Sequence, residues 1–471
     1  MKAKSMDRDL TRGNITKTML LFAVPMILGN LLQQASNIVD TLIVGRYLGA
    51  DALAAVGSAY TLMTFLTSII LGLCMGSGNV FSIYYGAKKE SDLKNSIFVS
   101  FVLIAGFTIV LNAAVFLGID QILKLLQTPE EIFLMLRKYL SVIFLGIGFT
   151  FIYNFFAFLL RAIGNSVIPL VFLGISAVIN IVLDLLFVIV FGRGVAGAAE
   201  ATVIAQGISA VSMVLYTCRK LPSLLPCMPK WTSSGRPSRL PCMPRFSECE
   251  DWKITRERIR QIAGFSFLTC IQQSVMNFGI LMIQGLVNSF GTAVMAAFAA
   301  AVKIDSFAYM PVQDFGNAFS IFISQNYGAR AWERIRKGVK SAAATAMLFS
   351  AAVSVIVWIA AKQLLMIFID PAETEILAVG VQYLRIEGAF YCGIGLLFLL
   401  YGYYRAIRKP GMSVVLTVIS LGTRVLLAYL LAPVPSVGVV GIWWAVPVGW
   451  FLADLVGVLY FKKSLRESTN S

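Results

Sequence analysis

The sequence has 471 residues, of which 58% are hydrophobic and 13% charged, and its mean hydropathy is +0.80. A soluble domain carries about 25% charged residues, so the composition excludes that class and indicates an all-α polytopic membrane protein. The net charge of +15 predicts no nucleic-acid partner, because basic residues gathered in the loops of one membrane face account for it.

Twelve apolar runs are long enough to cross a bilayer, for which a helix needs about 20 residues. The first run follows a basic N-terminus and is too long for a signal-peptide core. The second and eighth runs exceed one straight crossing, which indicates a tilt or a break. The predicted spans are 18–45, 52–86, 95–119, 139–160, 166–191, 195–217, 262–289, 293–328, 341–361, 383–404, 412–432 and 439–460.

The first span contains a proline and a carboxylate. Pro25 removes a helical hydrogen bond, because proline has no amide hydrogen. This predicts either a static bend or a hinge whose angle changes when Asp40 binds an ion. Asn37 and Asp40 lie three residues apart, which places both side chains on one helix face.

The fifth span repeats this combination in the segment INIVLD at 179–184. Asn180 and Asp184 are four residues apart and share a helix face. A carboxylate in mid-membrane costs about 2.5–3.5 kcal/mol, so it indicates function by default. Thr202 on the sixth span reaches the same depth as Asp40 and Asp184 if odd-numbered spans run outward.

These residues form an all-oxygen set, and the sequence contains no histidine that could relay protons instead. Two carboxylates, one amide and one hydroxyl suit Na⁺, or two carboxyl groups that share a proton. The alternative is that they only join helices by hydrogen bonds. We favour an ion site formed by Asp40, Asn180, Asp184 and Thr202.

A linker at 218–261, rich in proline, serine and basic residues, divides the chain into an N-terminal lobe (1–217) and a C-terminal lobe (262–471). The lobes are internal repeats. Matching segments recur at nearly constant spacing: LAAV at 53–56 and MAAF at 295–298, YGA at 85–87 and 327–329, KYL at 138–140 and QYL at 382–384, and RAI at 161–163 and 405–407. Six spans repeated in one orientation imply a pseudo-two-fold axis along the membrane normal.

The repeat serves as an internal control for the ion site. Arg424 stands where the N-terminal lobe has Asn180, Ala428 where it has Asp184, and Val446 where it has Thr202. Polar groups needed only for helix packing would be expected in both lobes. The asymmetry predicts a coupling site in the N-terminal lobe alone.

Other intramembrane acids are weaker candidates. Asp305 and Asp314 lie near Lys303 on the eighth span, which leaves a local ion pair and a site equally open. Glu387, two residues from Arg385, is expected in an interfacial ion pair. Asp454, on the last span, is expected to be solvated.

Charge in the loops predicts the orientation. Most of the 39 Lys and Arg residues fall on the side that carries both termini and the linker. Cytoplasmic loops have an excess of Lys and Arg. Both termini are therefore predicted to be cytoplasmic.

Three segments carry a resemblance to a known family: FAVPMILGNLLQQASNIVDTLIVGRYLG in the first span, LRAIGN after the fourth and QNYGA after the eighth. Together with the two six-span lobes, they resemble the multidrug and toxic compound extrusion (MATE) transporters. The likeness covers nearly the whole chain except the linker. The prokaryotic branch with a site in the N-terminal lobe is the nearest pattern.

The resemblance implies a secondary active exporter of amphipathic, often cationic compounds in a bacterial cytoplasmic membrane, driven by inward H⁺ or Na⁺. In this family the first helix is bent and bears an essential Asp, and these features correspond to Pro25 and Asp40. The family's Asn and Asp on the fifth helix and its Thr on the sixth correspond to Asn180, Asp184 and Thr202. A tyrosine at the start of the fourth helix matches Tyr139. Another branch of the family has acids on the seventh and tenth helices. The seventh span here has Gln272 and Gln273 and no acid, so the second site of that branch is expected to be absent.

The expected mechanism is alternating access, with rocking lobes and bending of the first span. Gln33, Gln34, Asn37 and Asn154 either line the substrate cavity or serve packing. A flippase for lipid-linked glycans is the alternative, but its pyrophosphate needs a more basic cavity than Lys303 and Arg424 provide. No catalytic constellation or cofactor is expected. The bilayer and small organic substrates are the expected partners of a monomer.

Overall fold

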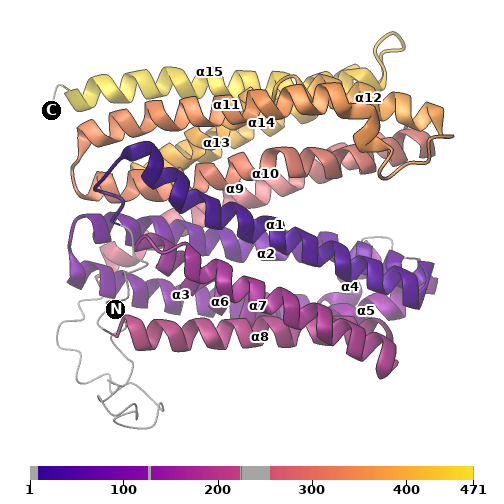
Figure 1. Cartoon of the computed structure of the whole chain (residues 1–471), viewed down its shortest axis with the longest axis horizontal. Helices are drawn as coiled ribbons and strands as arrows, with labels where there is room; N and C mark the ends of the chain where they lie inside the picture. The colour runs from indigo at the N-terminus through magenta and orange to yellow at the C-terminus, as the bar shows by residue number, and fades with distance from the viewer. Residues whose placement is uncertain (1–8, 126–128, 223, 225–254, 470–471) are drawn as a thin grey trace. The chain divides into compact units, whose positions relative to one another are not determined.

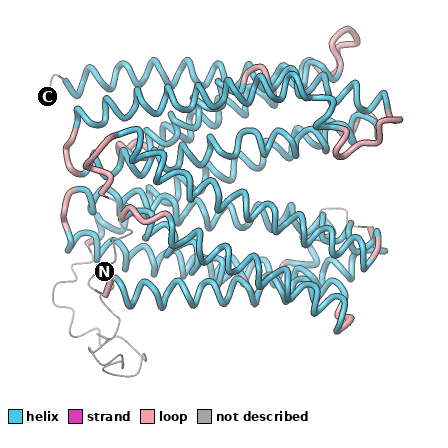
Figure 2. Tube along the Cα trace, viewed as in Figure 1, coloured by secondary structure: helices cyan, strands magenta, loops and turns pink. Residues whose placement is uncertain are grey.

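The computed structural model describes residues 9–125, 129–222, 224 and 255–469, and the regular structure in these ranges is helical (Figure 2). Among the described residues, ten helices are long and apolar enough to cross a membrane. Two bent helix pairs bring the number to 12 if each pair is one span. The prediction of an all-α polytopic protein is therefore confirmed.

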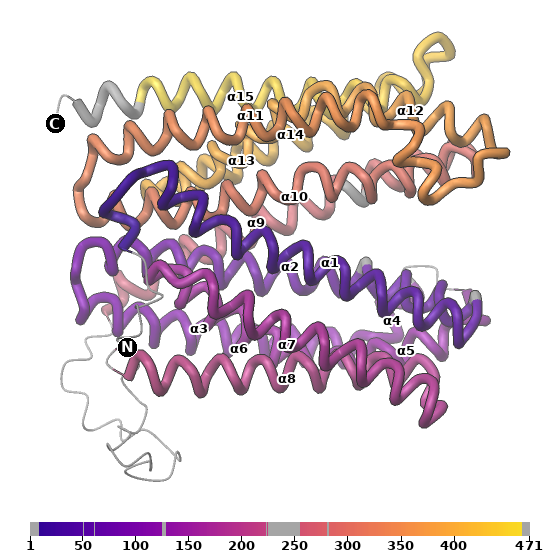
Figure 3. Tube along the Cα trace, viewed as in Figure 1, coloured from indigo at the N-terminus to yellow at the C-terminus, as the bar shows by residue number. Residues whose placement is uncertain are grey.

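The helices follow the predicted spans in chain order, with one additional short helix, α4, after the third span (Figures 1 and 3). Their bounds are α1 Ile15–Leu48, α2 Ala50–Gly86, α3 Glu90–Leu117, α4 Ile119–Leu125, α5 Glu130–Leu145, α6 Ile147–Ala162, α7 Val167–Asp184, the π-helix η1 Leu185–Val190, α8 Gly194–Lys220, α9 Arg256–Asn288, α10 Thr292–Gly328, α11 Trp332–Leu365, α12 Thr374–Gly388, α13 Tyr391–Ala406, α14 Pro410–Leu431 and α15 Val439–Thr469.

The breaks lie in the fourth and tenth spans, whereas length had indicated a tilt or a break in the second and eighth. Helices α2 and α10 each run unbroken for 37 residues. By contrast, α5 and α6 meet at 44°, and α12 and α13 at 51°. Gly146 forms the first break and lies against α8, where a Cβ atom would come within 2.7 Å of Val203. Glycine is therefore required there by close helix packing.

The chain forms two compact units. Within the described ranges, unit 1 comprises Asp9 and Leu28–Cys270, and unit 2 comprises Leu10–Ile27 together with the residues from Ile271 onward. Helix α1 thus begins in unit 2 and continues in unit 1, whereas α9 begins in unit 1 and continues in unit 2. The predicted linker 218–261 lies mostly outside the described residues.

In unit 1, the first part of α9 packs closely on α2. A Cβ atom on Gly72 would lie 2.6 Å from Cys270 Cα, and one on Gly76 would lie 2.6 Å from Ser266 Cα. The Ser77 and Ser266 hydroxyl groups share a hydrogen bond of 2.9 Å. Small residues spaced by four allow such close backbone contact between membrane helices.

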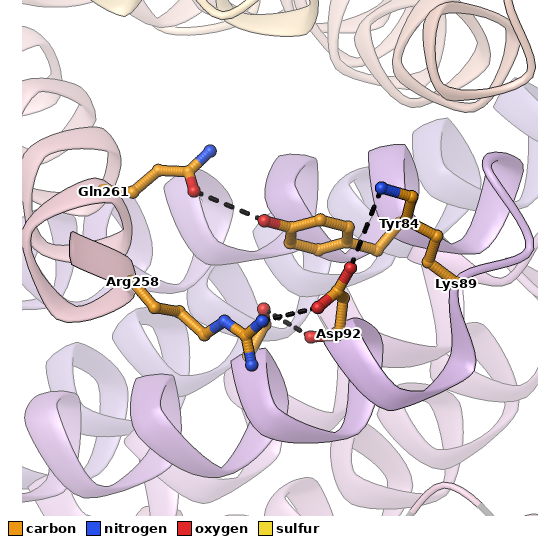
Figure 4. A network of polar contacts seen from close by, with 6 residues as sticks. Tyr84, Lys89, Asp92, Arg258 and Gln261 are labelled. Atoms are coloured by element: carbon orange, nitrogen blue, oxygen red, sulfur yellow. Dashed lines mark hydrogen bonds and ion pairs between the residues drawn. The ribbon is translucent and has the colours of Figure 1, made fainter. Parts of the chain in front are cut away.

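Polar contacts hold the same end of α9 against α2 and α3 (Figure 4). Arg258 pairs with Asp92 at 2.5 Å, and Lys89 lies 4.0 Å from the other carboxylate oxygen of Asp92. The Tyr84 hydroxyl donates to Gln261 Oε1 across 3.3 Å. The start of α9 is therefore fixed in unit 1 by both packing and charge.

In unit 2, Arg334 at the start of α11 holds the segment that precedes α1. Its guanidinium donates to the carbonyl oxygens of Leu10, Arg12 and Gly13. The Thr16 and Ser341 hydroxyl groups meet at 2.6 Å. The first part of α1 is therefore fixed in unit 2, as the first part of α9 is fixed in unit 1.

Candidate functional site

The polar pair on α7 lies in the interior of unit 1. Asn180 Nδ2 donates to Asp184 Oδ2 across 3.2 Å, one helical turn along. Asn180 is 6% exposed and Asp184 is 1% exposed. The helix widens into the π-helix η1 directly after Asp184. Short π-helical segments often occur at functional sites, so the backbone as well as the side chains singles out this position.

Two further helices bring oxygen atoms to this pair. Thr202 on α8 accepts a long hydrogen bond of 3.5 Å from Asn180 Nδ2, and its hydroxyl donates to Ala198 O within α8. Asp40 on α1 places its carboxyl group within hydrogen-bonding reach of Asp184. The structure thus brings Asp40, Asn180, Asp184 and Thr202 together, as the sequence predicted.

Tyr139 lies beside the two carboxyl groups. It belongs to α5, seven residues before the break at Gly146, and is 7% exposed. Its hydroxyl group interacts electrostatically with both Asp40 and Asp184. Its role in coupling remains a prediction, but its position beside the pair is now established.

Ser36 is a member of the site that the sequence reasoning missed. Its hydroxyl donates to Asn180 Oδ1 across 3.2 Å, and the side chain is 5% exposed. Ser36 and Asp40 are four residues apart on α1, the same spacing as Asn180 and Asp184 on α7. This spacing could have indicated that Ser36 belongs to the site, but a single serine in an apolar span is a weak signal.

The other predicted polar residues show different contacts. Asn37 donates to Gln34 on its own helix across 3.2 Å, and Asn154 donates to Thr150 O on its own helix. Gln33 is exposed. Their assignment to a substrate cavity remains a prediction, since these contacts within single helices neither form a cavity nor exclude one.

The site has unused acceptor capacity. Asp40 Oδ1 and Asp184 Oδ1 are buried and have no hydrogen-bond partner among the described residues. Buried polar atoms nearly always have partners. Two adjacent carboxyl groups with free oxygens can hold one proton between them, or contribute ligands to Na⁺ together with the Asn180 and Thr202 oxygens. In the described residues, no group of three His, Cys, Asp or Glu side chains forms a metal site.

Pro25 lies inside α1, close to the point where the helix passes from unit 2 to unit 1. The units divide between Ile27 and Leu28, two residues after the proline. A hinge at Pro25 would therefore act where α1 changes its packing partners. Whether it bends during transport remains a prediction.

Two expectations about the other acids are wrong. Glu387 is 1% exposed and buried in unit 2, not interfacial, and Arg385 instead stacks over the Trp358 ring. For Asp305, where an ion pair and a site had been left open, Lys303 stacks over the Phe368 ring and forms no ion pair with Asp305 among the described residues. Asp454 is 8% exposed, so it is buried and not solvated. The environment of each acid is set by packing between helices. The spacing of charges along one helix does not reveal this packing.

Comparison with known proteins assigns the family. The family model MatE matches residues 25–186 and 266–430, one match in each repeat. The chain belongs to the MATE family of transporters. Among curated MATE relatives, the probable multidrug resistance protein YpnP of Bacillus subtilis is 32% identical over 88% of this chain and 87% of its own length.

Two further comparisons agree with this assignment. The probable multidrug resistance protein YoeA of Bacillus subtilis is 26% identical over 96% of this MATE chain and 94% of its own length. A crystal structure of MATE in complex with MaL6 matches the whole of both chains with a TM-score of 0.88 and 20% identity. The likeness to this structure shows a shared fold, and the earlier resemblance to the MATE family is confirmed.

Proposed function

We propose that this transporter exports amphipathic, often cationic organic compounds in antiport with H⁺ or Na⁺. The names of the two Bacillus subtilis relatives support multidrug efflux. The pair formed by the half-buried Asp40 and the buried Asp184 supports ion coupling, and it is the observation that carries the proposal. Two acids are costly in membrane spans, so their presence needs a function that packing alone does not provide.

The coupling step begins with binding of the ion from outside. A proton forms an O–H bond on one carboxyl group and a hydrogen bond to the other, which removes the repulsion between two buried negative charges. Sodium would instead be held by the oxygens of Asp40, Asp184, Asn180 and Thr202. Asn180 orients Asp184 in either case, through the hydrogen bond of 3.2 Å.

Ion binding is then converted into movement by α1. Asp40 and Ser36 connect α1 to α7, while Pro25 lies nearer the start of the same helix. A change of charge at Asp40 alters the force on α1, and the proline provides a weak point for bending. Rocking of the lobes, together with bending of the first span, releases the substrate outside and later exposes the ion site to the cytoplasm.

The pair is tested by Asp40→Asn and Asp184→Asn, each assayed for efflux of a fluorescent organic cation from membrane vesicles. Each substitution keeps the side-chain size but removes the titratable charge. We expect loss of ion-driven efflux with normal amounts of folded protein. Asp51→Asn, at an exposed position on α2, is the matched control and should keep full activity. Full activity in both site variants would refute the proposal.

The coupling ion is identified by imposing gradients separately on purified transporter in liposomes. A pH gradient without Na⁺ tests proton coupling, and a Na⁺ gradient at equal pH tests sodium coupling. We expect one of them to drive substrate uptake against its gradient. Uptake driven by neither would contradict antiport, even if the substrate still crossed the membrane downhill.

We also propose that the monomer is the working unit and that no cofactor takes part.

Both termini are further proposed to face the cytoplasm of a bacterial cell. The excess of Lys and Arg in the loops on the side of the termini supports this orientation. Epitope tags at either end should be protected from protease in intact spheroplasts and cleaved after lysis. Cleavage of either tag in intact spheroplasts would refute the orientation.

A further inference from the structure

Helix α11 is longer than one membrane crossing requires, and its surplus turns are basic. The helix has 34 residues, whereas a crossing needs about 20. Its uncharged, mostly apolar part begins after Lys340 and ends before Lys362. The turns from Trp332 to Lys340 therefore extend beyond the hydrocarbon core, into the layer that the lipid headgroups occupy.

The exposed face of α11 runs without a break from its apolar part into these turns. Leu348, Val355 and Ile359 are 75%, 57% and 67% exposed, as expected of side chains that contact lipid tails. Lys340 lies two steps of four residues before Leu348, and Arg336 lies one further step before Lys340; both are exposed. Residues four apart share a helix face. The two basic side chains therefore continue the lipid-facing stripe toward the headgroups.

Helix α1 brings a third basic residue to the same level. The Thr16 and Ser341 hydroxyl groups share a hydrogen bond of 2.6 Å, which places the start of α1 against α11 within unit 2. Lys17 directly follows Thr16, Lys340 directly precedes Ser341, and both lysines are exposed. Two membrane helices thus present basic side chains beside one contact. Lys17, Arg336 and Lys340 are called the basic headgroup surface below.

The positive charge of this surface is not neutralised by the protein. Among the described residues, Lys17, Arg336 and Lys340 form no ion pair. The acid in the first turns of α11, Glu333, pairs instead with Lys337 at 2.7 Å. Basic pockets between membrane helices on the cytoplasmic side bind anionic headgroups. The surface has the charge and the place that such a headgroup requires.

An aromatic side chain lies at the same end of α11. Trp332 begins the helix and is 48% exposed, and its ring packs edge-on against Tyr327 at 5.4 Å between ring centroids. It stands four residues before Arg336 and so shares its face. Tryptophan is enriched where membrane meets water. This residue type independently assigns the exposed face of these turns to the interface.

The internal repeat shows that the fold does not require this surface. Helix α3 of unit 1 corresponds to α11, and the spacing between the two YGA segments pairs Lys94 with Arg336 and Phe98 with Lys340. Lys94 and Phe98 are partly buried, and Glu90 adds a negative charge to the first turn of α3. A general excess of basic residues on one membrane side would not distinguish the repeats in this way.

We propose that the basic headgroup surface binds the phosphate of an anionic phospholipid, with its acyl chains along the exposed apolar face of α11. The phosphate is held between α1 and α11. A bound lipid therefore adds to the contacts that fix the first part of α1 in unit 2. The assignment to the cytoplasmic leaflet rests on the orientation proposed above, but the binding itself does not.

Native mass spectrometry of the full-length transporter in detergent, titrated with dioleoyl phosphatidylglycerol, tests the surface. Lys17→Gln, Arg336→Gln and Lys340→Gln should each weaken binding about fivefold, as expected for one basic residue near an anionic headgroup, and the triple variant should lose on the order of a hundredfold. Lys362→Gln, an equally exposed lysine at the other end of α11, is the matched control and should bind as the wild type does.

Four results would overturn the proposal. The first is equal affinity of the wild type and the triple variant. The second is equal weakening by Lys362→Gln, which would indicate charge without a site. The third is equally tight binding of dioleoyl phosphatidylcholine, which has the same chains and no net charge. The fourth is displacement of the lipid by millimolar inorganic phosphate, which would indicate a site for a soluble anion. None of these results depends on whether the protein exports drugs.

Charge-preserving variants keep the test valid if the glutamine variants fold poorly. Arg336→Lys and Lys340→Arg retain the charge and should bind phosphatidylglycerol nearly as tightly as the wild type, and loss of binding in both would refute recognition by charge. Raising the salt concentration should weaken binding to the wild type, because salt screens exposed charges. Binding that salt leaves unchanged would count against the proposal.

Discussion

At the scale of single residues, Asn180 organises the site in unit 1 through one amide group. Its nitrogen donates to Asp184 and Thr202, and its oxygen accepts from Ser36. It therefore connects α7 with α8 and with α1. Loss of this amide leaves a buried carboxylate without its donor, which is more costly than loss of a neutral hydrogen bond.

The charge on the hydrogen-bond partner predicts which of two substitutions is more damaging. Asn180→Leu removes a hydrogen bond to a charged group, worth about 1.5–3 kcal/mol, and should weaken ion coupling by about tenfold or more. Ser36→Ala removes a neutral bond of about 1 kcal/mol and should weaken coupling by about fivefold. The measurement is the ion concentration that half-saturates efflux from liposomes.

The matched control for this ranking is Ser58→Ala, which removes a hydroxyl group at an exposed position of α2 and should leave coupling unchanged. A larger effect of Ser36→Ala than of Asn180→Leu would contradict the central position of the amide.

Sequence spacing predicted only part of these residue contacts. Asn180 and Asp184 were recognisable because they lie on one face of one helix, and the depth of Asp40 and Thr202 followed from the topology. Asp305 and Glu387 were not recognised as a pair, because they lie on different helices and meet only through tertiary packing. Glu387 was assigned to Arg385 for its nearness in sequence, whereas the fold points that arginine to Trp358.

At the scale of helices, the close crossing of α2 and α9 depends on two glycines of α2, Gly72 and Gly76, which have no side chain. Gly76→Val would place its Cβ atom only 2.6 Å from Ser266 Cα and 2.8 Å from Phe265 O. Backbone cannot move aside as a flexible side chain can, so we expect a loss of stability of at least about 1–3 kcal/mol. Thermal unfolding followed by size-exclusion chromatography measures it.

Gly106→Val on α3 is the matched control for this crossing, because nothing lies within 4 Å of its Cβ position. Both variants place the same branched side chain in a helix, so their difference isolates the contact between helices. Equal melting temperatures in the two variants would show that α9 does not pack against α2 in this way.

The ion pair between Arg258 and Asp92 should stabilise the same crossing modestly. The two side chains are 18% and 30% exposed, so solvent screens them only in part. A double-mutant cycle with Arg258→Ala and Asp92→Ala should give a coupling energy of about 0.5–1 kcal/mol from thermal unfolding. The coupling should decrease at high salt. Additive effects of the two single changes would mean that the pair in Figure 4 contributes no stability.

Helix positions were predictable because long apolar runs are the strongest signal in a membrane sequence. The breaks were not predictable from length. The 37-residue helices α2 and α10 stay continuous, since their glycines serve close packing, as Gly72, Gly76 and Gly316 show. The breaks fall instead at equivalent places in the two repeats, after Leu145 and after Gly388. Each lies a few residues beyond the tyrosine of KYL or QYL.

At the scale of the whole molecule, both α1 and α9 belong in part to each of the two compact units. The contacts of Arg334 hold the start of α1 in unit 2, while Ser36 and Asp40 belong to the proposed ion site in unit 1. A change at the ion site can therefore affect the other unit through α1 itself. The mechanical property that matters is the stiffness of α1 near the division between Ile27 and Leu28.

The place of Pro25 near this division predicts the effect of Pro25→Ala. Alanine restores the amide hydrogen that proline lacks and allows a bond to the carbonyl of Leu21, so α1 becomes stiffer. We expect several-fold slower efflux from liposomes, with ion binding in unit 1 retained. Pro410→Ala is the matched control, because Pro410 occupies the start of α14, where the missing hydrogen costs no helical bond. If Pro25→Ala transported at the rate of the wild type, α1 would be a rigid support, and the units would have to be coupled by other elements.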